Sequence, residues 1–515
     1  MDKSEEMVDV IPSTSNDKGL EELRYFLSVL AQDKKPDASE RFGVFYTERT
    51  PSRPPDVVNN EGDIITLVKM ALSKNKVIRA EGSGHSCCEE IAADGDIVLR
   101  LSGELRSFTV LSESCSTKTV KVGGGCYIGV NPLDDTSTEE NSLMYQLNEI
   151  NCALPIVGGI THQTVAGFMS TGSAGGSLQH GFEDVIREIH FINGLGKRMI
   201  ARKGTDLFNA VGVSLGLFGI ITYVVLEVPS PSFKVAGREV RRDMKELEID
   251  GKHVKDILES NEYAHLLWFP QMHARFAIEW TAHKSQEAKI EPYNNILSNW
   301  QTARGVASVL TVSQWFLRHF PLDITYQVIG FLLRLITKDT DSTFNDVWSN
   351  ALPSEDKVPV DSIMKTQFTE MWFPMDQTNN VMNILDLLFK DQQVAGNYAT
   401  EIYGAKKSAF WLSPSYDRDV VRIDPFWFVH QEGDPKKFFA HFWEYLLPVE
   451  GIRFHWGKFL PEVGKNYRGT KFDLKFLEES YPKMKDWLTE RERMDPNQVF
   501  VTKYWRKVFD IKNKT

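Results

Sequence analysis

The sequence has little cysteine, no excess of basic charge and no apolar N-terminal segment. Five cysteines in 515 residues are too few, and odd in number, for a disulfide framework, so we expect a reducing, intracellular compartment. Acidic residues outnumber basic ones, 70 against 59, which makes binding to nucleic-acid phosphates an unfavourable prediction. Residues 1–19 are polar and acidic and lack the apolar stretch of a secretory signal.

Two apolar segments are candidates for membrane association. Leu207–Leu226 carries no charge and has the length of a span, but its glycines and the β-branched run Ile220–Val225 favour a buried strand after a glycine turn. Gly305–Ile336 contains two shorter apolar stretches separated by charged residues and a proline. They predict either two core helices or an amphipathic pair that lies on a membrane surface or against a partner.

The composition and the sequence pattern of the chain change near residue 232. Before that point short apolar runs alternate with glycine clusters, with a helical pattern at 62–73, which predicts an α/β or α+β half. After Pro229 glycine becomes rarer, tryptophan and phenylalanine become common, and the helical patterns lengthen. Residues 1–39 form a polar lead-in with one expected helix at 20–31. The composition therefore predicts a lead-in and two domains.

The familiar nucleotide and hydrolase motifs are missing or incomplete. No glycine loop fits the Rossmann fingerprint or the phosphate loop of P-loop proteins. Residues 212–216 spell G-x-S-x-G, which would make Ser214 the nucleophile of a serine hydrolase if a strand preceded it and a helix followed. The residues that follow read as a strand instead. A serine hydrolase stays an alternative at this point.

A histidine follows an apolar strand pattern on a glycine loop. His85, in Glu81-Gly-Ser-Gly-His-Ser86, is freer to face a ligand than a histidine within a helix, although a structural role is equally open. Cys87 and Cys88 are adjacent, but no CxxC pair or second His/Cys cluster completes a set of four ligands. We expect no metal site.

The first half resembles the FAD-dependent oxidases of the vanillyl-alcohol-oxidase type. The similarity lies in residues 81–86, 155–172, 206–210 and 214–222. The resemblance implies an α+β fold with a two-subdomain, PCMH-type FAD-binding domain at 40–232, and FAD joined covalently to His85. The cofactor-binding residues that it implies are Glu81, Gly82, Ser83, Gly84, His85, Ser86, Thr164, Gly167, Ser170, Thr171, Gly172, Ser173, Gly175, Ile220 and Ile221.

The second half is similar to the sugar-lactone and alditol oxidases within this family. Residues 367–374, 412–416, 453–458 and 495–500 carry the similarity. It implies a cap, or substrate, domain at 233–515, built on an antiparallel sheet with helices and carrying an apolar insertion near 303–340. The insertion implies peripheral membrane contact through 305–336.

Four cap residues are implied as site residues. The resemblance gives Lys458 the role of a cation near the reduced flavin or a substrate hydroxyl, and Glu401 that of the carboxylate that orients or deprotonates this hydroxyl. His455 and Tyr403 complete the set. Without the resemblance, Glu401 and Lys458 read as solvated surface and His455 as a core histidine.

The sequence departs from the family pattern at two places near the expected substrate. Glu401-Ile-Tyr403 stands where the family often has Glu-x-Arg, and Gly172-Ser-Ala-Gly175 stands where it commonly has Gly-Thr-His-Gly. We therefore expect a flavoprotein that oxidises a CH–OH group of a sugar lactone, polyol or related alcohol and passes electrons to O2 or another acceptor. The alternatives are a serine hydrolase that uses Ser214 and a catalytically altered flavin-fold binding protein.

Overall fold

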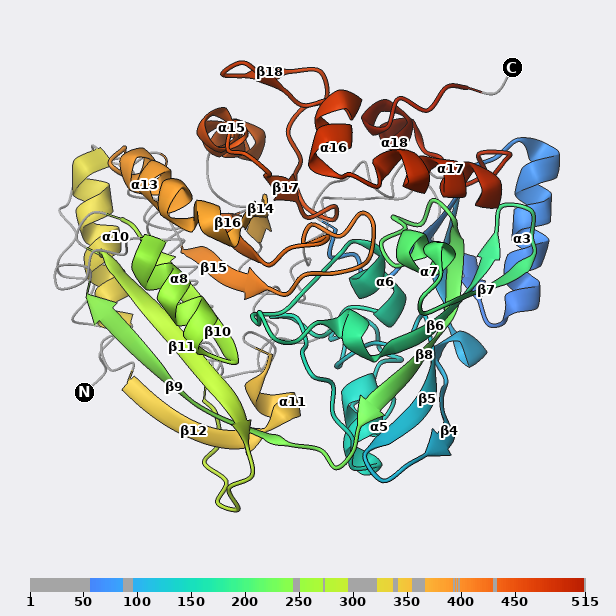
Figure 1. Ribbon diagram of the computed structural model, residues 1–515, viewed down its shortest axis with the longest axis horizontal. Helices are drawn as coiled ribbons and strands as arrows, with labels where there is room; N and C mark the ends of the chain where they lie inside the picture. Colours follow the sequence, from blue (N-terminus) through green and yellow to red (C-terminus); the bar gives the residue numbers. More distant parts are fainter. Residues whose placement is uncertain are drawn as a thin grey trace, which may run out of the picture.

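The computed structural model describes residues 56–86, 96–243, 251–271, 274–294, 322–336, 341–353, 366–391, 394, 396, 399–428 and 433–513. The expected lead-in with its helix at 20–31, Cys87, Cys88 and the apolar stretch up to residue 321 lie outside these residues. The described part forms two halves that lie side by side, and each half is built around its own sheets (Figure 1).

The first half contains two sheets. One is parallel, with the strand order β1–β3–β2, and the other is antiparallel, with the order β4–β5–β8–β6–β7. Its helices and strands are β1 (Asp56–Val58), α3 (Glu61–Lys74), β2 (Ile78–Glu81), β3 (Ile97–Leu101), η1 (Gly103–Arg106), β4 (Phe108–Glu113), β5 (Thr117–Gly123), α5 (Leu143–Glu149), α6 (Val165–Ser170), η2 (Phe182–Val185), β6 (Ile186–Asn193), β7 (Arg198–Arg202), α7 (Asp206–Val211) and β8 (Gly219–Pro229).

Local sequence explains where the predicted elements of this half begin and end. The helix expected at 62–73 is α3, whose side-chain cap is Asn60 and whose end is Asn75 in the left-handed conformation. The run Ile220–Val225 lies in β8, the central strand of the antiparallel sheet, as its β-branched residues predicted. Among the described residues, no helix combines the length and apolar character needed to cross a membrane.

The second half is organised by one large antiparallel sheet. Its strand order is β12–β9–β11–β10–β15–β16–β14–β17, with β13 paired to β16. The elements are β9 (Lys234–Asp243), α8 (Gly251–Ser260), β10 (Tyr263–Phe269), β11 (Phe276–Ser285), α10 (Leu322–Ile336), β12 (Asp341–Val347), α11 (Trp348–Ala351), β13 (Thr366–Phe368), β14 (Met371–Pro374), η3 (Met375–Gln377), α13 (Thr378–Phe389), β15 (Thr400–Ala405), β16 (Val420–Phe428), α15 (Pro435–Leu446), β17 (Arg453–Phe454), β18 (Asn466–Tyr467), β19 (Thr470–Lys471), α16 (Leu474–Ser480), α17 (Met484–Met494) and α18 (Lys503–Val508).

The two faces of this sheet have different neighbours. Because side chains alternate along a strand, residues directly opposite in register share a face. Ile402 and Ile423 are opposite each other and belong to one apolar core with Leu385 of α13. Tyr403 and Arg422, also opposite each other, are on the other face, which meets residues 174–176 of the first half. This second face therefore turns Tyr403 and Arg422 toward the first half.

The end of the chain returns to the first half. Figure 1 shows α17 near α3 and α7, and α17 contacts α7. The indole of Trp487 donates a hydrogen bond to Ala210 O at 3.0 Å, and the Ile78 amide donates one to Val499 O at 2.8 Å. Phe500 belongs to the apolar core of the parallel sheet. The segment 484–511, which the sequence assigned to the cap, thus helps to build the first half.

Two expectations about boundaries and membranes stay predictions. The strand β8 ends at Pro229 and β9 begins at Lys234 in a different sheet, beside the predicted boundary at 232. Of the apolar segment 305–336, the structure describes α10, where Ile329 and Leu333 are buried and Phe331 is exposed.

Candidate functional site

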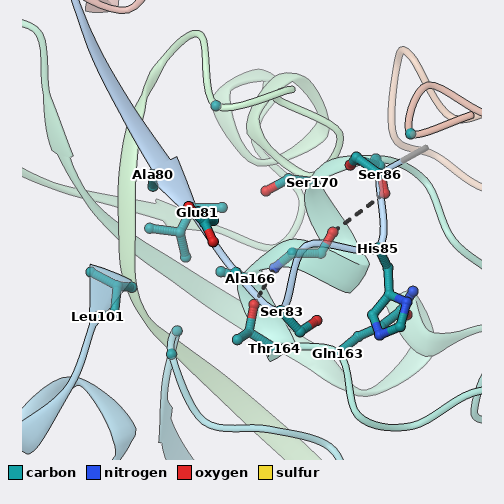
Figure 2. Close-up of a pocket in the computed structure, with 18 of the residues that line it drawn as sticks. Ala80, Glu81, Ser83, His85, Ser86, Leu101, Gln163, Thr164, Ala166 and Ser170 are labelled. Atoms are coloured by element: carbon teal, nitrogen blue, oxygen red, sulfur yellow. Dashed lines mark hydrogen bonds between the residues drawn. The ribbon is translucent and has the colours of Figure 1, made fainter. Parts of the chain in front are cut away.

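A cavity lies where glycine-rich turns of the first half meet the loop after β17. Most of its lining comes from five segments: β2 with the loop after it, the turn after β5, α6 with the residues beside it, the turn before β8 with the start of that strand, and the loop at 455–458. The end of β3, Arg106 and Trp505 complete the lining. Figure 2 shows Ser83, His85 and Ser86 of the first segment near Thr164 and Ser170 of the third. Of the expected residues, those that line it are Glu81, Gly82, Ser83, Gly84, His85, Ser86, Thr164, Gly167, Ser170, Thr171, Ile220, Ile221, His455 and Lys458.

Close packing explains why the loop after β2 needs glycine. A Cβ atom at Gly82 would lie 2.7 Å from Thr164 Oγ1, and Gly84 has a φ of 84° in the left-handed region. The same Thr164 oxygen accepts the Gly167 amide at 3.2 Å and caps α6. The two loops that the sequence singled out therefore touch each other, and each leaves backbone close to the cavity.

His85 is buried in this cavity wall. Its exposed fraction is 8%, and its ring centroid lies 4.3 Å from that of His162. Burial, followed by the positive charges of His162 and Lys458, holds the pKa of His85 well below its usual value. The imidazole is therefore neutral at physiological pH, and a neutral imidazole retains a lone pair on one ring nitrogen.

Three arginines line the cavity, and the sequence analysis did not identify them. Arg79 donates to the carbonyls of Leu215 and Gly216 at 2.9 and 3.2 Å. Arg100 pairs with Glu81 at 2.8 Å, and Arg106 pairs with Asp134 at 2.7 Å. Arginines dispersed over two strands, β2 and β3, and the short helix η1 leave no motif in the sequence, so only the fold brings them together. Their charges suit a ligand that carries phosphates.

Two cap residues reach the cavity from the loop after β17. His455 Nδ1 accepts the Gly457 amide at 3.0 Å, so the neutral ring carries its proton on Nε2 and donates it to Ser173 Oγ at 2.9 Å. Burial, only partly offset by the charge of Glu370, lowers the pKa of His455 to about 4. The Lys458 ammonium lies 3.8 Å from the centre of the Phe368 ring.

Five expected residues do not line this cavity. Ser173 reaches it through His455, whereas Gly172 and Gly175 hold turns behind it: Gly172 has a φ of 78°, and a Cβ at Gly175 would lie 2.2 Å from Val157 O. Glu401 is buried on β15 opposite Asp424. Tyr403 lines a second, smaller cavity together with Tyr263, His265 and Trp280.

An arginine from the neighbouring strand lies beside Tyr403, although β15 itself carries no arginine. Arg422 is directly opposite Tyr403 in register, and its guanidinium carbon lies 4.4 Å from the centre of the Tyr403 ring. It is also 3.3 Å from Glu370 and 3.1 Å from Asp424. Sequence reasoning missed these residues because Glu370, in the connection between β13 and β14, is more than fifty positions from Arg422 and Asp424 on β16.

The surroundings of Ser214 contradict a nucleophile elbow. The helix α7 precedes the serine and the strand β8 follows it, which is the reverse of the order that this motif requires. Ser214 is 1% exposed, does not line the main cavity, and its hydroxyl accepts the Gly216 amide. The serine hydrolase alternative is therefore wrong.

Two family models match the chain. One, described as D-arabinono-1,4-lactone oxidase, matches residues 228–508, and the other, described as FAD binding domain, matches residues 57–201. The chain thus contains an FAD-binding domain. The residues that line the cavity fit this cofactor. Backbone amides of the glycine turns and the three arginines suit its phosphates, and Leu101, Ile220 and Ile221 provide apolar surface.

Curated relatives and solved structures agree with these matches. The chain is 25% identical over 463 residues to L-gulono-1,4-lactone dehydrogenase of Mycobacterium tuberculosis, covering 87% of this chain and 94% of the relative. It is 22% identical over 456 residues to L-gulonolactone oxidase of Mus musculus, covering 87% and 93%. Cholesterol oxidase from Brevibacterium sterolicum shares the fold, with a TM-score of 0.65 and 13% identity over 88% of this chain and 93% of that one.

Proposed function

This chain belongs to the D-arabinono-1,4-lactone oxidase family, and we propose that it oxidises a CH–OH group of a sugar lactone, polyol or related alcohol. When bound, FAD supplies the hydride acceptor. The electrons then pass to O2 or to another acceptor. The observation that carries the proposal is the cavity itself, because one wall brings the loop with His85 against the cap residues His455 and Lys458.

We assign the first half of the chain to the cofactor. The loops at 81–86 and 164–171 offer backbone amides to the pyrophosphate, and the proposed boundary near 232 separates them from most of the cap. His85 is proposed to carry FAD covalently through the 8α-methyl group of the flavin. Its burial and neutral state support this, because bond formation requires the free lone pair of a ring nitrogen.

We assign the second half to the substrate. Lys458 places an ammonium group in the cavity, where it can stabilise negative charge that develops during oxidation. His455 presents a neutral ring fixed by Ser173 and by the Gly457 amide. We propose Glu401, buried on β15, as the carboxylate that orients the hydroxyl. Tyr403, two positions further along the same strand, lines the second cavity.

The test is an anaerobic bleaching experiment on the purified protein. A yellow protein whose flavin absorbance falls on addition of an aldonolactone or alditol supports the proposed function. Acid precipitation then tests the covalent bond: the colour should stay with the pellet in the wild type and move to the supernatant in His85→Ala. A Ser83→Ala variant serves as a control in the same loop and should keep its colour in the pellet.

The contrary outcomes separate the alternatives. A colourless protein that takes up no added FAD would remove the oxidoreductase proposal. Covalent flavin in His85→Ala would remove only the attachment point. A yellow protein that no aldonolactone, alditol or simple alcohol reduces would favour the catalytically altered binding protein.

A further inference from the structure

A closed ring of contacts joins the cap sheet to residues 173–174 of the first half. The guanidinium of Arg422 donates to Ala174 O at 2.7 Å. The neighbouring residue Ser173 holds His455 at 2.9 Å, and the His455 amide donates to Glu370 O at 3.1 Å. The Glu370 carboxylate completes the ring with Arg422 at 3.3 Å. Five residues from four separate segments thus fix one another's positions.

The charged side chains of the ring are buried, whereas Ser173 and Ala174 are half-buried. The side chains of Arg422 and Glu370 are 10% and 3% exposed, and that of Asp424, the second acidic neighbour of Arg422, is 1% exposed. The Trp372 indole donates to Glu370 at 2.9 Å, so the carboxylate has a neutral donor as well as a cation. A charge cluster this deeply buried requires full pairing, because removing one partner leaves the other uncompensated.

The charges of the ring act directly on the two cap residues that line the cavity. Burial raises the pKa of Glu370, but the charges of Arg422, His455 and Lys458 together lower it below its usual value, so the group is ionised. Burial, followed by the Glu370 charge, raises the pKa of Asp424. Glu370 is therefore the anion that faces both His455 and Lys458.

We propose that Arg422 and Glu370 are positioning residues of the oxidation site, which hold His455 and Lys458 in place against the loop at 173–175. Neither of the two lines the cavity, so they act through the ring. The inference rests on the proposed function, because it assigns this geometry to the oxidation step. Arginine suits the role since its planar fork can bind Ala174 O and two carboxyl groups at once, which an ammonium cannot.

The central variant is Arg422→Met, which keeps much of the side-chain length and removes the fork. We expect it to retain FAD, to reduce the flavin about 100-fold more slowly with an aldonolactone, and to keep nearly the same half-saturating concentration. The half-saturating concentration should hold because Arg422 does not touch the substrate. Arg422→Lys retains the charge and should recover part of the rate.

The matched control is Arg491→Met, which removes another buried arginine, 2% exposed, on α17. It should lower stability and leave the reduction rate within about threefold.

A second readout does not depend on substrate. The Arg422 charge helps to keep the pKa of His455 low, with Glu370 and Lys458 as the other charged neighbours. The flavin absorption spectrum, titrated between pH 4 and 8, should gain a transition at higher pH in Arg422→Met than in the wild type, and Arg491→Met should behave as the wild type. An unchanged titration together with an unchanged reduction rate would overturn the assignment.

Failure of the proposed function is recognisable separately. In that case the wild type itself holds FAD but is not reduced by any aldonolactone or alditol. The pH titration then decides the positioning role alone: a shifted transition in Arg422→Met supports the ring, and an unshifted one removes it. If Arg422→Met does not fold, Glu370→Gln is titrated instead, since it breaks the same ring with a smaller change in shape.

Discussion

At the scale of single residues, Lys458 is the part of the proposed site that can be tested most directly. Lys458 lies against the Phe368 ring with its side chain buried, and it shares the wall with His455. We expect Lys458→Met to keep FAD but to slow anaerobic flavin reduction about 100-fold, because a preorganised charge is lost where negative charge develops.

The control for this variant is Lys465→Met. Lys465 also lies over an aromatic ring, that of Tyr467 at 5.2 Å, but it is exposed and outside the cavity. Stopped-flow bleaching should show an unchanged rate for this control. Equal rates in Lys458→Met and the wild type would mean that the ammonium has no part in the reaction.

Residue identities at the site were only partly accessible to sequence reasoning. His85, His455 and Lys458 line the cavity that the resemblance implied for them. Arg422 could not be found in this way, since its role follows from strand register, which sets which distant residues face each other. The departure at Tyr403 was visible, but the neighbouring guanidinium was not.

At the scale of elements, the strand β9 carries a buried carboxyl group with a single hydrogen bond that the structure shows. Glu239 accepts the Tyr293 hydroxyl at 2.8 Å and is 4% exposed, and burial raises its pKa to about 6. The folded protein therefore binds this proton more tightly than the unfolded chain. Its contribution to stability is complete below about pH 4.5 and is lost as pH rises through about 6.

We therefore expect the free energy of unfolding of Glu239→Gln to equal that of the wild type at about pH 4.5. Above about pH 6.5 it should be larger than that of the wild type by about 2 kcal/mol, because the neutral amide has no charge to bury. Thermal unfolding across this pH range measures the difference. Glu450→Gln, a change at an exposed carboxylate, should show no such divergence. A constant difference between Glu239→Gln and the wild type at all pH values would contradict the assignment.

Elements with a strong local pattern were the easiest to predict. The strand β8 and the helix α3 follow from a β-branched run and from apolar spacing with caps at both ends. The G-x-S-x-G match was excluded by element order, which the sequence already indicated by placing a strand pattern after Ser214. Short motifs are ambiguous because their chemistry depends on the elements that flank them.

At the scale of the whole molecule, the return of the chain end makes the flavin-binding half discontinuous. Removing residues 484–511 would expose the core shared by Phe500 with the parallel sheet and the surface that Trp487 covers. We expect a fragment of residues 40–232 to aggregate or to fail to bind FAD. A fusion of 40–232 to 484–513 through a flexible linker should bind FAD better, measured by flavin absorbance after gel filtration. Tight FAD binding by the short fragment would contradict this view.

The sequence by itself determined the cofactor class, through motifs that resemble a known family. It also determined the change in composition near residue 232 and the glycine loops that line the main cavity. These properties are local: glycine turns, strand patterns and short motifs occupy neighbouring positions. Only the tertiary structure decided that the chain end completes the first half, that three arginines line the cavity, and that Arg422 and Glu370 form a ring with residues 173–174. Such contacts join residues far apart in the chain, and the packing and register that create them leave no trace in local sequence.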